Sequence, residues 1–262
     1  MKIGLALSGG GARGVFHIGV LQALKEHNVK IDLVAGTSAG AIVGAMFCAG
    51  KEPKEMLEMA IRTNWYHFLK PKLPIHGIAG LGYLKELVRS QIPHNCFEKL
   101  DIPLIVTTTN MNKGVLDLYS SGELSRPVAA SCAVPIIFRP VYINSVMHLD
   151  GGILMNLPAS PIRQSCDYLI GVSLMPLTYQ DSHELSGYIN LMSRCLELSV
   201  NANSAMQKAQ CDLLIESDHI ANFSRYDLRE AKELYELGYS VATKSLDQIP
   251  SMNDSVRAAP VS

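Results

Sequence analysis

The 262-residue sequence predicts an α/β fold in which a mostly parallel sheet is covered by helices on both faces. Short apolar runs at 3–7 and 31–35 each end in a glycine-containing turn, and apolar residues at helical spacing follow each turn. Strands that alternate with helices along a chain favour this arrangement over one with segregated helices and strands.

The rest of the chain continues the pattern. Helices are predicted from these segments: 14–26, 41–48, 185–210 and 227–246. Further strands are predicted at these: 104–109, 116–119, 141–149, 168–174 and 213–216. Because no repeat, linker or break in composition interrupts them, we expect one domain over 1–250 and a flexible tail over 251–262.

Composition narrows the class of protein. With 48% hydrophobic and 18% charged residues, the chain is too polar for a bundle of membrane spans and too apolar for disorder. A formal net charge of −1 gives no electrostatic footprint for nucleic acid. Although 33–49 is nearly uncharged, its first part is better explained as a strand and turn than as a span.

Six cysteines are scattered singly, without the spacing of a zinc site, so we expect reduced thiols and no metal or other cofactor. The apolar run that follows Lys2 stops at Ser8, and Arg13 comes soon after, which is unlike a signal peptide. We therefore expect a cytoplasmic protein.

The strongest local signal is a G-x-S-x-G sequence, Gly36-Thr37-Ser38-Ala39-Gly40, between a predicted strand and a predicted helix. This context is the one that a nucleophile elbow requires, because a sharp turn presents the serine hydroxyl at the end of the strand. A bulky side chain at Gly36 or Gly40 would not fit, because the backbone and the neighbouring helix approach closely. The alternative is a surface of small residues that only serves helix packing.

A second glycine-rich turn spans Gly9 to Gly14 and also joins a strand to a helix. It matches G-x-G-x-x-G, but a dinucleotide site needs an acid at the end of the second strand, whereas Asp32 stands at its start. A phosphate-binding P-loop needs Lys-Ser or Lys-Thr where Val15-Phe16 stands. The remaining interpretations are a plain turn, or an oxyanion hole whose donors include the N–H groups of Gly10 and Gly11.

A catalytic serine also needs a base. Of the eight histidines, only His183 and His219 are late enough in the chain for an ordinary triad, and neither follows a clear strand in a small-residue turn. Asp150, by contrast, ends an apolar strand and precedes Gly151 and Gly152. It is either a carboxylate aimed at the serine or a residue that only initiates a turn.

Taken together, these motifs resemble the patatin-like phospholipase family. The Gly-rich loop, the G-T-S-A-G elbow and the D-G-G turn occur in that family's order. A fourth block, Ala130 to Pro140, is similar to the family's A-S-x-A-x-P-x-x-F-x-P segment, and Glu233 to Tyr239 is similar to its closing helix. The resemblance covers residues 1 to about 175 well and the helical end more loosely.

The resemblance implies a patatin-type three-layer α/β/α sandwich and a Ser38–Asp150 dyad that works without histidine. It implies an oxyanion hole made by Gly9, Gly10, Gly11 and Ala39. The other motif glycines are Gly14, Gly36, Gly40, Gly151 and Gly152. Arg13 is expected either to attract a phosphate head group or to pair with an acidic neighbour.

The expected function is hydrolysis of acyl esters in phospholipids or lysophospholipids. A regulatory or lipid-binding protein with incidental esterase activity is the alternative, and an acyltransferase is a third possibility that lacks the histidine base and basic patch it needs. Trp65 to Lys72 combines aromatic and basic residues, which suits either peripheral membrane contact or a packed connection. The oligomeric state and the natural lipid are not predicted.

Overall fold

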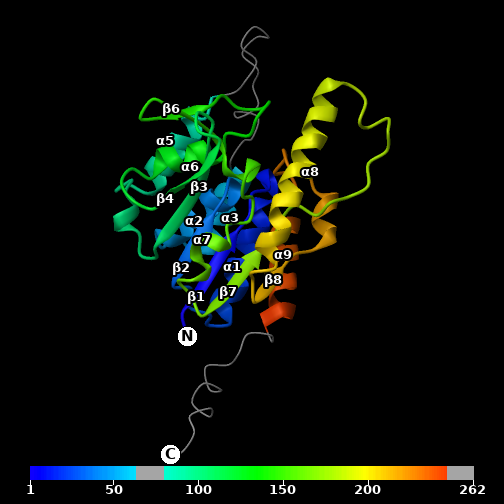
Figure 1. The fold of residues 1–262 in the computed structure, drawn as a ribbon. Coiled ribbons are helices and arrows are strands. Elements are labelled where there is room, and N and C mark those ends of the chain that lie inside the picture. The colour runs from blue at the N-terminus through cyan, green and yellow to red at the C-terminus, as the bar shows by residue number, and fades with distance from the viewer. Residues whose placement is uncertain (63–79, 247–262) are drawn as a thin grey trace, which may run out of the picture.

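The computed structural model describes residues 1–62 and 80–246. The predicted membrane-contact segment Trp65 to Lys72 and the predicted tail 251–262 lie outside these residues. Within them, one sheet has the strand order β5-β6-β3-β2-β1-β7-β8, and β4 also pairs with β3 (Figure 1). The strands are β1 (Ile3–Leu7), β2 (Leu33–Gly36), β3 (Leu104–Asn110), β4 (Val115–Tyr119), β5 (Val141–Ile143), β6 (Val146–Asp150), β7 (Tyr168–Val172) and β8 (Leu213–Ile215).

The strands β3, β2, β1, β7 and β8 run parallel, whereas β4, β5 and β6 are antiparallel to their neighbours. The main helices are α1 (Val15–Glu26), α2 (Ala39–Cys48), α3 (Pro53–Arg62), α5 (Gly82–Gln91), α6 (Ser125–Ser131), α7 (Ser160–Arg163), α8 (Tyr188–Lys208) and α9 (Ala231–Leu246). The expected α/β fold with a mostly parallel sheet is therefore confirmed.

Successive side chains of a buried strand point to opposite faces of the sheet, so each strand packs against the helices on both faces. From β1, Leu5 and Leu7 enter the larger core with α1, α2 and α9, whereas Ala6 packs in a smaller core that includes Ile162 of α7. The sheet is thus covered on both faces, as a three-layer sandwich requires. No helix in the described ranges is long and apolar enough to cross a membrane.

One predicted strand is wrong in detail. The segment 141–149 forms a hairpin of β5 and β6 instead of one strand, because Asn144 and Ser145 between them have φ values of 49° and 64°. Two consecutive residues with positive φ make the tight turn whose twist suits a hairpin. The hairpin reverses the chain so that β6 ends beside β3.

Helices α1 and α9 approach each other at backbone distance. A Cβ on Gly19 would lie 2.0 Å from the carbonyl oxygen of Tyr235, and one on Gly238 would lie 2.2 Å from that of Phe16. Glycines on both helices therefore allow a contact that larger residues would prevent. This contact fixes the C-terminal helix against the helix that follows the glycine loop.

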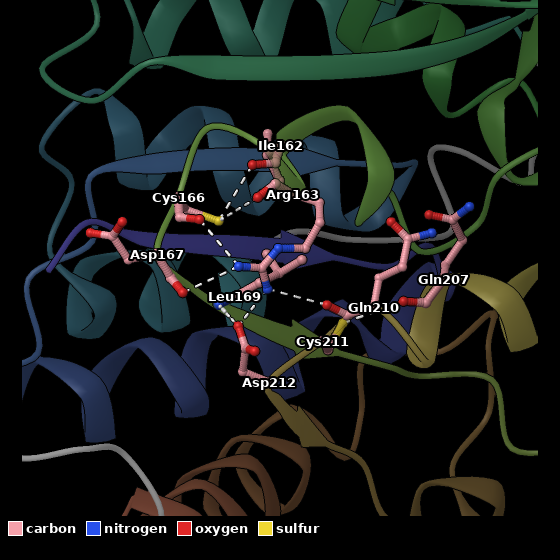
Figure 2. A network of polar contacts seen from close by, with 9 residues as sticks. All are labelled: Ile162, Arg163, Cys166, Asp167, Leu169, Gln207, Gln210, Cys211 and Asp212. Atoms are coloured by element: carbon pink, nitrogen blue, oxygen red, sulfur yellow. Dashed lines mark hydrogen bonds and ion pairs between the residues drawn. The ribbon is translucent and has the colours of Figure 1, made fainter.

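A polar network joins α7 to the starts of β7 and β8 (Figure 2). The Arg163 guanidinium donates to the carbonyl oxygens of Cys166 and Asp167 at 3.1 and 3.2 Å, and it pairs with the Asp212 carboxylate at 2.5 Å. The same carboxylate accepts from the N–H of Leu169 at 2.6 Å. One arginine therefore supplies several charged hydrogen bonds that tie three elements together.

We predict that Arg163→Ala lowers the free energy of unfolding by about 2 kcal/mol, because hydrogen bonds to a charged group are lost together. Urea denaturation measures this change. The control is Arg62→Ala, since the Arg62 side chain is 80% exposed and its ion pair with Glu58 is worth about 0.5 kcal/mol or less. Equal losses in the two variants would contradict the prediction.

Candidate active site

Ser38 lies in the turn between β2 and α2, as the motif predicts. Its φ of 52° and ψ of −119° are strained for a residue with a side chain. The turn is tight, because a Cβ on Gly36 would lie 2.5 Å from the carbonyl oxygen of Gly40, and one on Gly40 would lie 2.2 Å from that of Leu7. The expectation that no bulky side chain fits at these two positions is confirmed, and even a Cβ would be too close to the backbone.

A residue outside the motif holds the strained serine. The Ser131 hydroxyl, at the end of α6, accepts a hydrogen bond from the N–H of Ser38 at 2.8 Å, and both groups are buried. The neighbouring Cys132 thiol lies against the Ser38 hydroxyl, and burial raises the pKa of Cys132 well above its usual value. A neutral thiol therefore stands beside the serine.

Asp150 ends β6 on the same side of the sheet as Ser38. In the strand register it lies opposite Thr108 of β3, two residues beyond Val106, which pairs with Gly36 at the end of β2. Its main chain is fixed on both sides, since its N–H donates to Ala133 and its carbonyl accepts from Thr109 Oγ1 at 2.8 Å.

The two oxygens of the Asp150 carboxyl have different surroundings. Oδ1 accepts from the N–H of Gly152 at 2.7 Å, whereas Oδ2 is buried and makes no hydrogen bond to any described residue. Burial raises the pKa of Asp150 to about 6, although the Ser38 hydroxyl and the Gly152 N–H oppose the rise. This carboxyl can thus accept a proton near neutral pH.

The glycine loop faces the same place. Gly9 donates its N–H to the carbonyl of Asn156 at 3.1 Å, so that group is already used. No described group accepts a hydrogen bond from the N–H of Gly10, Gly11 or Ala39, and these three remain as candidate oxyanion donors. Gly9 is better explained as a support of the loop.

Gly11 has a φ of +62°, and a Cβ there would lie 2.3 Å from the carbonyl oxygen of Arg225. That carbonyl accepts the N–H of Ala12 at 2.9 Å, so a segment late in the chain closes the loop. Glycine is required here both for its backbone conformation and for the close approach.

Two cavities meet at Ser38. The first, of about 170 Å³, is lined almost entirely by apolar side chains from α1, α2, α3, α5 and the 132–138 segment, including Met46, Met56 and Leu84. The second, of about 110 Å³, holds Asp150 and is more polar, with Asn156 and Glu197 in its wall. An elongated apolar group and a polar group can therefore lie on opposite sides of one serine.

Among the described residues, no histidine lines either cavity. The nearest in sequence to Asp150 is His148, whose Nε2 lies 2.9 Å from Asp117 and 3.1 Å from the Tyr119 hydroxyl. His67 and His76 lie outside the described ranges. Asp150 thus stands beside Ser38 in a cavity that no described histidine lines.

Arg13 is expected to contact a head group or to pair with an acidic neighbour, and its guanidinium instead bonds main-chain carbonyls. Its guanidinium donates to the carbonyl oxygens of Phe223 and Ala221 at 2.9 and 3.1 Å, and it lines neither cavity. Arg13 therefore ties the glycine loop to the 221–223 segment.

Sequence reasoning missed Asn203, which supports the turn after Asp150. From α8, its side-chain nitrogen donates to the carbonyls of Gly152 and Ile153 at 3.0 and 3.1 Å, and its oxygen accepts the N–H of Asn156. An asparagine within a long amphipathic helix carries no motif that would mark it. The fold and these residues together define an α/β protein that presents a serine on a strand-to-helix elbow next to a buried carboxyl.

Comparison with known proteins places the chain within that class. A family model described as patatin-like phospholipase matches residues 5–162, so the chain belongs to the patatin-like phospholipase family. The resemblance inferred from the motifs is confirmed. The match spans the glycine loop, the elbow and the D-G-G turn, but the described fold continues to Leu246.

This chain matches only part of the length of its longer relatives. An uncharacterized NTE family protein of Mycobacterium bovis is 34% identical over 176 residues, which are 66% of this chain and 49% of that protein. Lysophospholipase NTE1 of Scheffersomyces stipitis is 27% identical over 278 residues, with 92% of this chain and 18% of the relative covered. VipD from Legionella pneumophila shares the fold, with a TM-score of 0.53 and 17% identity over 94% of this chain and 66% of that one.

The raised pKa of Asp150 predicts a stability effect. A carboxyl whose pKa is higher in the folded than in the unfolded state destabilises the fold once it ionises, so the cost is absent below pH 4 and complete above pH 6. Asp150→Asn should therefore be more stable than the natural protein at pH 8, by up to about 3 kcal/mol. Thermal unfolding at pH 4 and pH 8 tests this, and a variant that is less stable at pH 8 would contradict it.

Proposed function

We propose that this protein hydrolyses acyl esters of lipids, with Ser38 as the nucleophile and Asp150 as the general base. The observation that carries the proposal is the buried Oδ2 of Asp150. It makes no hydrogen bond to any described residue, and it belongs to a carboxyl whose pKa burial raises and the neighbouring Ser38 hydroxyl lowers. Catalytic hydrogen bonds of free enzymes are often long and shorten only when substrate binds.

In the proposed reaction, Asp150 takes the proton of Ser38 while the serine oxygen attacks the ester carbonyl. The N–H groups of Gly10, Gly11 and Ala39 are the candidate donors to the negative oxygen of the tetrahedral intermediate, and the positive end of α2 adds to them. Asp150 then returns the proton to the departing alcohol. Water, activated by the same carboxylate, attacks the acyl-enzyme and releases the fatty acid.

The two cavities differ in polarity, so we assign one to the acyl chain of the substrate and the other to its alcohol part. The apolar cavity fits the acyl chain, because Met46, Met56 and Leu84 offer it no polar partner. The more polar cavity fits the leaving alcohol. The lysophospholipase name of the Scheffersomyces stipitis relative agrees with this class of substrate.

We also propose that the protein works in the cytoplasm and docks on lipid surfaces through the first turn of α8. Tyr188, Ile189, Leu191 and Met192 are 88%, 69%, 51% and 52% exposed, and the stretch 185–193 contains no charged residue. In Figure 1 this end of α8 stands clear of the rest of the described chain. The same helix lines the polar cavity, so docking would bring the lipid to its entrance.

The dyad predicts a pH profile. For a soluble nitrophenyl butyrate ester, kcat/KM should rise with pH and level off above an apparent pKa near 6, because only ionised Asp150 accepts the proton. Ser38→Ala should lower turnover by at least about a thousandfold. Ser90→Ala, at an exposed position of α5, is the control. Full activity of Ser38→Ala would exclude the mechanism.

Labelling separates this proposal from a regulatory or lipid-binding protein. A fluorophosphonate that reacts with activated serines should label the natural protein and Ser90→Ala, but not Ser38→Ala. Absence of labelling in the natural protein would favour the binding role.

Docking predicts that Ile189→Glu with Leu191→Glu lowers the fraction bound to phosphatidylcholine vesicles by about tenfold or more, because two apolar side chains no longer leave water. Flotation of vesicles measures the bound fraction. Met206→Glu is the matched control, since Met206 is 76% exposed on the same helix but far from its first turn. Equal binding by the double variant and the control, with unchanged melting temperatures, would disprove docking through this turn.

A further inference from the structure

A cluster of charged side chains stands beside the polar cavity. Arg194 and Arg225 pair with the buried carboxylate of Glu197, and Arg13 lies near enough to interact electrostatically with Glu197 and Arg225. Glu197 pairs with Arg194 at 3.0 Å and with Arg225 at 3.7 Å, and its side chain is only 8% exposed. Even with Asp150 ionised in the same cavity, this cluster carries an excess of positive charge.

Two of the arginines donate hydrogen bonds to main-chain carbonyl oxygens. Arg13 donates to the carbonyls of the 221–223 segment, and Arg194 donates to the carbonyl of Thr178 at 2.8 Å as well as to Glu197. Neither lines a cavity. Both therefore stabilise the surrounding backbone, and neither guanidinium borders the space beside Ser38.

Arg225 differs in position and in contacts. It lines both cavities where they meet, together with Ser38 and Gly11. Its side chain is 25% exposed, and its 3.7 Å ion pair with Glu197 is longer than a good hydrogen bond. Its carbonyl bonds the glycine loop, so the backbone from which the guanidinium projects is fixed beside the candidate oxyanion donors.

The surroundings favour an additional anion. Burial lowers the pKa of Arg13 to about 10, and the positive charge of Arg225 is the next largest cause of this shift. Glu197 is shared between two guanidinium groups, so it neutralises neither completely. An anionic ligand at Arg225 would relieve this repulsion, and a guanidinium can hold a phosphate through two parallel hydrogen bonds.

We propose that Arg225 binds the phosphodiester of the substrate and so selects phospholipids and lysophospholipids over neutral acylglycerols. This inference rests on the proposed hydrolysis at Ser38. The acyl chain lies in the apolar cavity, and the phosphate, a few bonds beyond the ester, lies in the polar cavity and replaces Glu197 as the partner of Arg225. Glu197 stays bound to Arg194, so no charge is left buried alone.

The test compares two substrates that differ only in the phosphate-containing head group, a lysophosphatidylcholine and a monoacylglycerol of the same acyl chain. Arg225→Gln should lower kcat/KM for the lysophospholipid, mainly through KM, by about tenfold or more beyond any loss on the monoacylglycerol. Arg225→Lys should retain part of the preference. Arg229→Gln is the control, because the Arg229 side chain is 88% exposed and lines neither cavity.

Glu197→Gln distinguishes phosphate binding by Arg225 from an Arg225–Glu197 ion pair that only stabilises the fold. Glutamine still accepts a hydrogen bond from Arg194 but no longer competes for Arg225, so KM for the lysophospholipid should fall. If Arg225 and Glu197 only stabilised each other, both variants would lose activity on both substrates alike. That result, or an unchanged preference in Arg225→Gln, would overturn the proposal.

Binding distinguishes failure of this inference from failure of the proposed function. Calorimetry with Ser38→Ala, alone and combined with Arg225→Gln, measures affinity for lysophosphatidylcholine without turnover. A natural protein that hydrolyses no ester, yet whose Ser38→Ala form binds this lipid through Arg225, would reject the hydrolase and keep the recognition. Equal affinities of the single and double variants would reject the recognition, whatever the activity.

Discussion

A carboxyl group kept away from water is the constraint on which the rest of the site depends. Asp150 is a weak base unless it is desolvated, and desolvation destabilises its charged form. Its main chain is consequently fixed by Thr109 and Ala133, while Asn203 holds the turn behind it. These contacts keep a costly group in place, and Oδ2 has no hydrogen-bond partner among the described residues.

The serine side of the site is held by a different kind of contact. Ser38 keeps an unfavourable backbone conformation because β1, β2 and the start of α2 leave no space for another path, and Ser131 binds its N–H. The glycine loop is in turn closed by the Arg225 carbonyl. Rigid backbone positions, more than side-chain hydrogen bonds, thus arrange the groups around the two cavities.

Much of the fold and of this site could be predicted from sequence, because strand, small-residue turn and helix are encoded within a few residues of Ser38. Asp150 needed the family resemblance, since an aspartate before two glycines is also an ordinary turn. The hairpin at 144–145 was missed because Asn-Ser is a weak turn signal beside the apolar run that contains it. Arg225 lies in no motif, and only tertiary structure places it beside Gly11 and Ser38, which lie 214 and 187 positions earlier. The glycine-loop motif marks Arg13, but the carbonyls that it bonds, those of Ala221 and Phe223, lie more than 200 residues later in the sequence.

The carbonyl of Arg225 that fills the space next to Gly11 has a consequence for biosynthesis. The glycine loop and the serine elbow are synthesised well before the segment that closes the loop, because Arg225 follows Ser38 by 187 residues. Domains fold as units during synthesis at a rate of about 5–20 residues per second. About 10 to 40 s therefore pass between the synthesis of Ser38 and that of Arg225, and throughout that interval the glycine loop lacks the carbonyl that closes it.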